Sequence, residues 1–197
     1  MDAYELITTR RSTRAFREEP VPEEALLKVL EAGRHAPSGG NNQTTHLLVI
    51  RNQEILKELA EIAEQEFAKM EIFPDTYKSL AGSIRASKKG GYVFHYQAPV
   101  LVLTANRRDY SNNIADCACV LENMMLMANA LDLGSVWINQ LKWLNESERV
   151  NEVLFRIGMK EEERVYGGLA IGLPDTEDGL PMRTPLPRTG NPVTFTD

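Results

Sequence analysis

Cysteine and long apolar runs are both scarce in this chain of 197 residues. Its two cysteines, Cys117 and Cys119, stand two residues apart on an expected helix and point in different directions, which indicates neither a disulfide framework nor a metal site. No apolar run approaches the roughly 20 residues needed to span a bilayer. Residues Met1 to Glu5 lack the basic and then apolar pattern of a signal peptide. We therefore expect a cytoplasmic protein with no metal and no membrane partner.

An excess of basic residues is also missing. The chain has 22 Lys and Arg against 28 Asp and Glu, a formal net charge of -6, which argues against a general surface for nucleic acid. No Gly-x-Gly-x-x-Gly motif follows a strand, so the sequence carries no Rossmann dinucleotide site. There are no internal repeats, and 43% of the residues are hydrophobic. We expect one domain over residues 1–197 with room for a real core.

Hydrophobic periodicity predicts that helices and strands follow one another along the chain. Asp2 can cap a short first helix, with Glu5 three residues later. The residues from Ile72 to Gln97 are the least regular part, and such segments more often carry specificity than fold. Longer helices are expected over residues 23–36, 53–70, 111–133 and 146–157, a buried strand over 45–51, and further strands over 99–105, 134–140 and 165–173.

Two segments suggest contacts beyond a simple monomer. The expected helix over residues 111–133 is apolar on two faces, so it needs two partners, which are either both in its own chain or partly in another subunit. The tail over residues 174–197 contains four prolines after Pro174 and has no helical period. Its end, residues 192–196, alternates like an edge strand. We expect this tail to cross onto the sheet of a partner subunit.

Two polar stretches bracket the expected helix over residues 23–36. Residues 10–14 read Arg-Arg-Ser-Thr-Arg, and three guanidiniums with a hydroxyl suit a phosphate. Residues 36–43 read Ala-Pro-Ser-Gly-Gly-Asn-Asn-Gln, and side-chain amides suit the edge of a planar heteroaromatic ring. A solvated arginine cluster and a plain helix-to-strand turn are the alternative interpretations. The two stretches together, one helix apart, favour a ligand.

Both stretches resemble the nitroreductase family of FMN-dependent oxidoreductases, which have an Arg-Arg/His-Ser-x-Arg/Lys turn and, one helix later, Pro-Ser-x-x-Asn-x-Gln. Residues 133–138 resemble the family's Leu-Gly-x-x-Trp-Ile/Val stretch, and residues 168–174 with Arg183 resemble its last strand and basic tail. The resemblance implies an α+β fold, a three-layer sandwich with a central, mostly antiparallel sheet flanked by helices. It also implies an intertwined homodimer with two FMN sites, in which residues 72–97 form a variable, lid-like segment.

The resemblance assigns cofactor contacts to residues of several segments. Arg14 falls near the pyrimidine side of the flavin, where a fixed cation stabilises the negative charge gained on reduction. A surface pair of Arg14 with Glu18 or Glu19 is the alternative. The resemblance assigns the phosphate to Arg10, Ser12 and Arg183, with Arg11 nearby. It assigns the flavin ring to residues of the other subunit, namely Pro37, Ser38, Gly39, Asn41 and Gln43. It places Asn139 and Gln140 near flavin N5.

The implied chemistry needs no catalytic side chain, because flavin N5 performs it. NAD(P)H is a transient donor that passes hydride to the flavin and leaves, and a nitroaromatic, quinone or similar electron-poor acceptor then takes its place in a ping-pong mechanism. His95 is a candidate proton donor, although a lone histidine among aromatic residues more often packs in the core. The alternatives are a reductive dehalogenase or flavin-breakdown enzyme, a non-catalytic flavin-binding protein, and a phospholigand or nucleic-acid module.

Overall fold

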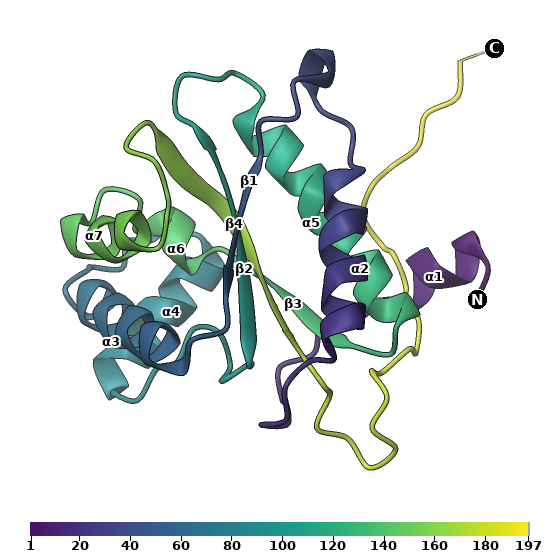
Figure 1. Cartoon of the computed structure of the whole chain (residues 1–197), viewed down its shortest axis with the longest axis horizontal. Coiled ribbons are helices and arrows are strands. Elements are labelled where there is room, and N and C mark those ends of the chain that lie inside the picture. The colour runs from purple at the N-terminus through teal and green to yellow at the C-terminus, as the bar shows by residue number, and fades with distance from the viewer. Residues whose placement is uncertain (197) are drawn as a thin grey trace.

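A central sheet with helices on both faces forms the framework of the chain (Figure 1). The computed structural model describes residues 1–196. The strands are β1 (His46–Ile50), β2 (Val100–Arg107), β3 (Gly134–Ile138) and β4 (Glu163–Gly172). The helices are α1 (Ala3–Thr9), α2 (Glu23–Arg34), α3 (Gln53–Ala68), α4 (Lys78–Lys89), α5 (Asn113–Ala130), α6 (Gln140–Trp143) and α7 (Glu148–Arg156), with a 3-10 turn η1 (Gly39–Asn41).

The sheet has the order β1-β2-β4-β3, and every neighbouring pair is antiparallel. β2 is buried over seven of its eight positions, as its nearly continuous apolar sequence predicts for a central strand. β1 lies at an edge, where Val49 is exposed, so the strand expected to be buried is buried on one face only. The expected α+β fold with an antiparallel sheet and flanking helices is confirmed.

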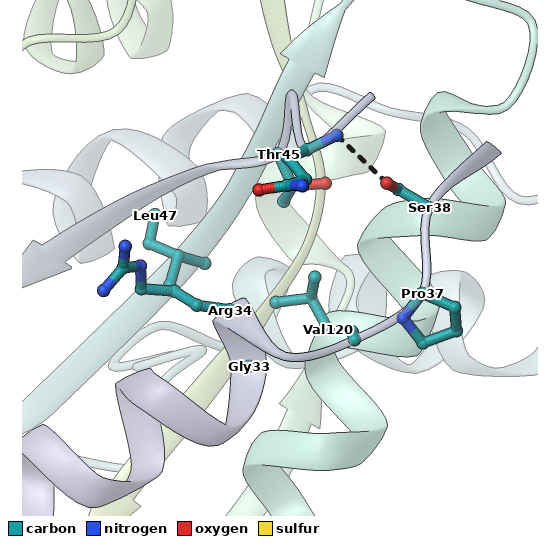
Figure 2. Close-up of a pocket in the computed structure, with 9 residues that line it drawn as sticks. Gly33, Arg34, Pro37, Ser38, Thr45, Leu47 and Val120 are labelled. Carbon is teal, nitrogen blue, oxygen red and sulfur yellow. Dashed lines mark hydrogen bonds between the residues drawn. The ribbon is translucent and has the colours of Figure 1, made fainter. Parts of the chain in front are cut away.

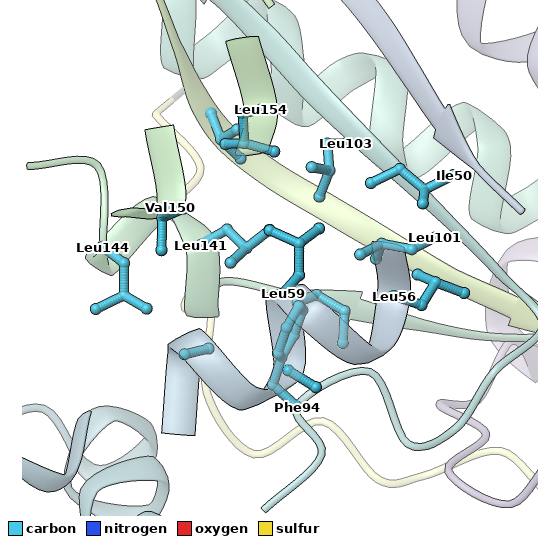
Figure 3. Packing of buried hydrophobic residues seen from close by; sticks show 14 of the residues in the cluster. Ile50, Leu56, Leu59, Phe94, Leu101, Leu103, Leu141, Leu144, Val150 and Leu154 are labelled. Atoms are coloured by element: carbon cyan, nitrogen blue, oxygen red, sulfur yellow. The ribbon is translucent and has the colours of Figure 1, made fainter. Parts of the chain in front are cut away.

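Two hydrophobic clusters fill the space on either side of the sheet. One lies under α3, α4, α6 and α7, where Phe94 meets leucines from the sheet and the helices (Figure 3). Phe67 belongs to the same cluster. The other lies under α2 and α5 (Figure 1). Cys117, Leu121 and Val120 from both apolar faces of α5 are buried within this chain. The two-faced helix therefore finds most of its packing partners in its own monomer.

The segment over residues 72–97 is more regular than expected. It contains α4, which packs against α3 and buries Ala81, Ser83, Ile84 and Ser87. Two of these four positions are serines, so the buried face lacks the apolar repeat that sequence analysis relies on. The expectation of an irregular segment was wrong for this reason.

The C-terminal tail forms no strand within residues 175–196. Its β-type pairing within the described residues is an isolated bridge between Pro174 and Phe16. The strand expected over residues 192–196 is not formed in this chain, and Val193 and Phe195 are largely exposed. Within residues 1–196, no helix has the length and apolar content to cross a membrane, and no cluster of side chains suits a metal ion.

Candidate functional site

The arginine-rich turn follows α1 and is fixed against the sheet. Thr13 N–H donates to the Ser135 carbonyl at 2.9 Å, and Arg17 N–H donates to the Leu173 carbonyl at 2.9 Å. The turn approaches β3 so closely that a Cβ on Gly134 would lie 2.7 Å from Thr13 Cγ2. The backbone that carries Arg10 to Arg14 therefore has a defined place at the ends of β3 and β4.

The three arginines of this turn carry charge that no carboxylate of residues 1–196 neutralises. Arg10, Arg11 and Arg14 form no ion pair within that range. Arg11 donates to the Thr184 carbonyl at 2.6 Å, and the Arg14 guanidinium carbon stands 5.9 Å from the centroid of the Tyr96 ring. The alternative pairing of Arg14 with Glu18 or Glu19 is not formed. Uncompensated guanidiniums on a fixed turn suit an anionic group such as a phosphate.

Arg183, the fourth predicted arginine, is already paired. Its guanidinium donates to Asp132 Oδ1 at 2.6 Å, to Asn129 Oδ1 at 3.3 Å and to the Asn129 carbonyl. This places a cation at the C-terminal end of α5, where the helix dipole favours it. The Asn129 amide also donates to the Leu6 carbonyl and to Thr9 Oγ1 of α1. Arg183 thus ties the tail to α5, and it is a weaker phosphate candidate than the arginines of the turn.

The amide-rich turn is anchored by a buried carboxylate that lies far away in the sequence. Asp116 of α5 accepts from Gly39 N–H at 3.0 Å and from the Tyr110 hydroxyl at 2.8 Å. The same hydroxyl lies 3.2 Å from the Gly39 carbonyl. A Cβ on Gly39 would lie 2.2 Å from Asn112 Nδ2, so any other residue here would require the Asn112 side chain to move. The role of Asp116 as the anchor of this turn has no signal in the local sequence.

Within the turn, the polar side chains partly satisfy one another. Ser38 Oγ accepts from Gln43 N–H at 3.0 Å, and Gln43 Nε2 donates to Asn41 Oδ1 at 3.1 Å. The Asn41 NH₂ and the Gln43 carbonyl oxygen keep their other hydrogen-bonding capacity for a ligand. Gly40, Asn41 and Gln43 all have positive φ, between 51° and 59°. The turn is a shaped surface with free amide groups, as the sequence predicts.

A small cavity lies beneath this turn (Figure 2). Its volume is about 150 Å³, and it is enclosed by the end of α2, the start of β1 and Val120 of α5. Pro37 and Ser38 line it on one side and Leu47 on another (Figure 2). Pockets for whole organic ligands usually measure about 300–1,000 Å³. This cavity in one chain is therefore too small to hold a ligand of that size.

The two turns lie at opposite ends of α2 (Figure 1). A helix of 12 residues spans about 18 Å at 1.5 Å per residue. The arginines of residues 10–14 precede that helix in the chain and the amides of residues 38–43 follow it, so they lie toward its opposite ends. One chain does not bring them together around a single flavin ring.

The structure directs the Gln140 side chain into the protein. Gln140 Oε1 accepts from Asn139 N–H at 3.1 Å, and Gln140 Nε2 lies 3.0 Å from the Tyr92 hydroxyl and 3.3 Å from Ser83 Oγ. Asn139 Oδ1 accepts from the Trp137 indole at 2.9 Å. Burial raises the pKa of Tyr92, so its hydroxyl stays a donor. Asn139 Oδ1 and the Gln140 side chain hold the end of β3, and Gln140 ties it to α4.

His95 and Cys117 are both buried. His95 packs edge-on against Phe94, and burial lowers its pKa, so the imidazole is neutral at pH 7. Burial raises the pKa of the Cys117 thiol to about 11, which removes it as a nucleophile. The structure therefore favours a packing role for His95 over a role as proton donor.

Known proteins share this fold and this sequence. A protein of Archaeoglobus fulgidus named NADH dehydrogenase/NAD(P)H nitroreductase is 28% identical over 176 residues, which cover 89% of this chain and 87% of that protein. A crystal structure of a nitroreductase with bound FMN from Bacteroides fragilis is 33% identical, with a TM-score of 0.85 and coverage of 100% of both chains. A nitroreductase with bound FMN from Desulfitobacterium hafniense has a TM-score of 0.80, with coverage of 98% of this chain and 97% of the other; at 23% identity this likeness shows the fold alone. The model of the Nitroreductase family matches residues 7–173, and the chain belongs to this family.

Proposed function

We propose that this chain is an FMN-dependent oxidoreductase that takes two electrons from NADH or NADPH and passes them to an electron-poor acceptor such as a nitroaromatic or a quinone. The names of its relatives, and the FMN bound to the Bacteroides fragilis nitroreductase, support the cofactor and the reaction class. The observation that carries the proposal is the pair of ligand-binding turns held at opposite ends of α2. The arginines of one turn suit the FMN phosphate, and the amides of the other turn suit the polar edge of the flavin ring.

Two copies of the chain complete the site in this proposal. Residues 10–14 of one copy and residues 37–43 of the other face the same cofactor, because in a single copy they lie toward opposite ends of α2. Exposed apolar side chains that a partner can cover support the dimer: Tyr4 is 79% and Ile7 57% exposed on α1, and Phe195 is 86% exposed on the tail. The tail then lies on the partner, as the sequence predicts for residues 174–197.

The residues present fit FMN. Arg10, Arg11 and Ser12 hold the phosphate, since the two guanidiniums have no carboxylate partner within residues 1–196. The small residues of the amide turn let its backbone pass close to a flat ring, and the free amide groups of Asn41 and Gln43 bond its polar edge. Bound FMN supplies the redox chemistry by accepting hydride from the nicotinamide at N5 and returning two electrons to the acceptor in a second step.

The test is the visible spectrum of the purified protein, before and after anaerobic addition of NADH or NADPH, together with its molecular mass in solution. We expect a yellow dimer that bleaches with the nicotinamide and regains colour with a nitroaromatic or a quinone. A bound flavin that no nicotinamide bleaches would indicate a carrier. A colourless monomer that stays so with added FMN would refute the proposal.

Acceptor classes separate the enzyme alternatives within the same fold. The reduced protein is offered a nitroaromatic, a quinone, a halogenated phenol and oxygen alone in separate reactions. Rapid reoxidation by the first two with intact FMN supports the proposal. Halide release, or loss of the flavin itself under oxygen, would instead support the dehalogenase or flavin-breakdown alternative.

A further inference from the structure

Tyr96 has a backbone conformation that its side chain disfavours. Tyr96 and Gln97 both have φ of 57°, in the left-handed region where bulky side chains are outliers. Such strain persists only where the surrounding structure enforces it, and it gathers at functional positions.

The strained pair turns the Tyr96 ring toward the arginine-rich turn. Tyr96 N–H donates to the Val93 carbonyl at 3.1 Å, and Ala98 N–H donates to the His95 carbonyl at 3.1 Å, which makes a tight double turn just before β2. His95 and Ala98 are buried on either side, whereas Tyr96 is half-buried. Its ring then lies under the Arg14 guanidinium, 5.9 Å from centroid to carbon.

An aromatic ring holds a cation without cancelling its charge. A carboxylate would also fix Arg14, but it would neutralise the field that Arg14 exerts on a ligand. The Tyr96 ring attracts the guanidinium through its quadrupole and leaves the net charge in place. A cation fixed in advance stabilises negative charge without the cost of reorganising when that charge develops.

We propose that Tyr96 is a positioning residue that holds Arg14 against the pyrimidine side of the flavin and thereby raises the flavin's reduction potential. The inference rests on the proposed function, which places that part of the cofactor beside Arg14. It assigns to the Tyr96 ring, and not to its hydroxyl, the task of keeping the cation where negative charge accumulates on two-electron reduction.

The test compares Tyr96→Asn, Tyr96→Phe and the matched control Gln97→Asn. Asparagine accepts positive φ more readily than tyrosine or glutamine, so both Asn variants relieve the same strain. Only Tyr96→Asn removes the ring beside Arg14. The measurements are the two-electron midpoint potential of the bound flavin, the FMN dissociation constant and the melting temperature of the apoprotein.

We expect Tyr96→Asn to weaken the preference for reduced over oxidised FMN about two- to fivefold, a potential lower by about 10–20 mV. Tyr96→Phe keeps the wild-type potential, since it keeps the ring. Gln97→Asn also keeps it, and its melting temperature does not fall. A role in folding alone would lower the melting temperature of Tyr96→Asn and leave the potential unchanged.

Two results would overturn the inference. One is an unchanged potential in Tyr96→Asn when Arg14→Gln lowers it, and the other is an equal fall in Gln97→Asn and Tyr96→Asn. Failure of the proposed function is separately visible, because the wild-type protein would then bind no FMN. In that case this inference falls with it.

Discussion

Replacing Asp116 with alanine tests how the amide-rich turn is held. The carboxylate is 4% exposed and accepts from Gly39 N–H and from the Tyr110 hydroxyl. Hydrogen bonds to a charged group contribute about 1.5–3 kcal/mol each, so two amount to about 3–6 kcal/mol. Gly39 and Tyr110 are only half-buried, so water can replace part of the lost bonding. We expect the free energy of unfolding to fall by about 2–4 kcal/mol.

Two milder variants separate the contributions of the two hydrogen bonds that Asp116 accepts. In Asp116→Asn, the amide oxygen still accepts from Gly39, and the Tyr110 hydroxyl can rotate to accept from the new NH₂ group, so a loss of about 1 kcal/mol is expected. Tyr110→Phe removes one bond to the carboxylate and is expected to cost about 1.5–2 kcal/mol. Urea denaturation of the apoproteins measures each loss.

The same variants report on the site through FMN affinity, measured by quenching of flavin fluorescence. Asp116→Ala frees the turn that supplies half of the proposed contacts, so its affinity should fall at least about tenfold, equal to about 1.4 kcal/mol. Asp116→Asn should fall much less. If Asp116→Ala loses under about 1 kcal/mol of stability and keeps its FMN affinity, the carboxylate does not hold the turn.

Three further predictions concern the other parts of the fold. Arg183→Ala should lower the melting temperature by about 2–4 °C in calorimetry, with a loss of FMN affinity of less than about tenfold. Arg10→Ala should lose more than about tenfold in FMN affinity in the same flavin titration. A larger loss of FMN affinity in Arg183→Ala than in Arg10→Ala would assign Arg183 to the phosphate. Gly134→Ala should displace the arginine-rich turn and weaken FMN binding, and Thr13→Ser added to it should restore part of the affinity in the same titration. Burial lowers the pKa of His95 from 6.5, so the unfolded chain binds the proton first as the pH falls below that value, and the native state loses stability. His95→Leu should therefore reduce the fall in the free energy of unfolding between pH 7 and 5, by up to about 1.4 kcal/mol per pH unit. Identical pH slopes for the wild type and the variant in urea titrations would contradict this.

Most of the framework could be predicted from hydrophobic period and turn residues. Each of the four strands and the helices α1, α2, α3, α5 and α7 was expected close to its observed bounds. The helix α5 ends earlier than Gly134, because Asp132 itself takes the left-handed conformation with φ of 60°. α4 was missed since serines occupy part of its buried face. The short helix α6 was also missed, because one turn of helix has too few residues to show a period.

The site was predictable as motifs but not as contacts. Composition pointed to the arginine-rich and amide-rich turns, because each concentrates its chemistry in a few consecutive residues. The roles of Asp116, Gln140 and Tyr96 depend on partners 77, 48 and 82 positions away, and no local pattern reports such pairs. The pairing of Arg183 with Asp132 is equally remote in sequence. Tertiary structure is needed to tell a free cation from a neutralised one.

In the proposed dimer, α2 fixes how far apart the arginine-rich and amide-rich turns of one chain lie, so each FMN contacts turns of both chains. Both FMN molecules leave together when the two chains of that dimer separate. Cofactor retention should therefore follow the total protein concentration as well as the concentration of free FMN. Dilution alone, with nothing else altered, would then release FMN and remove the yellow colour from the protein.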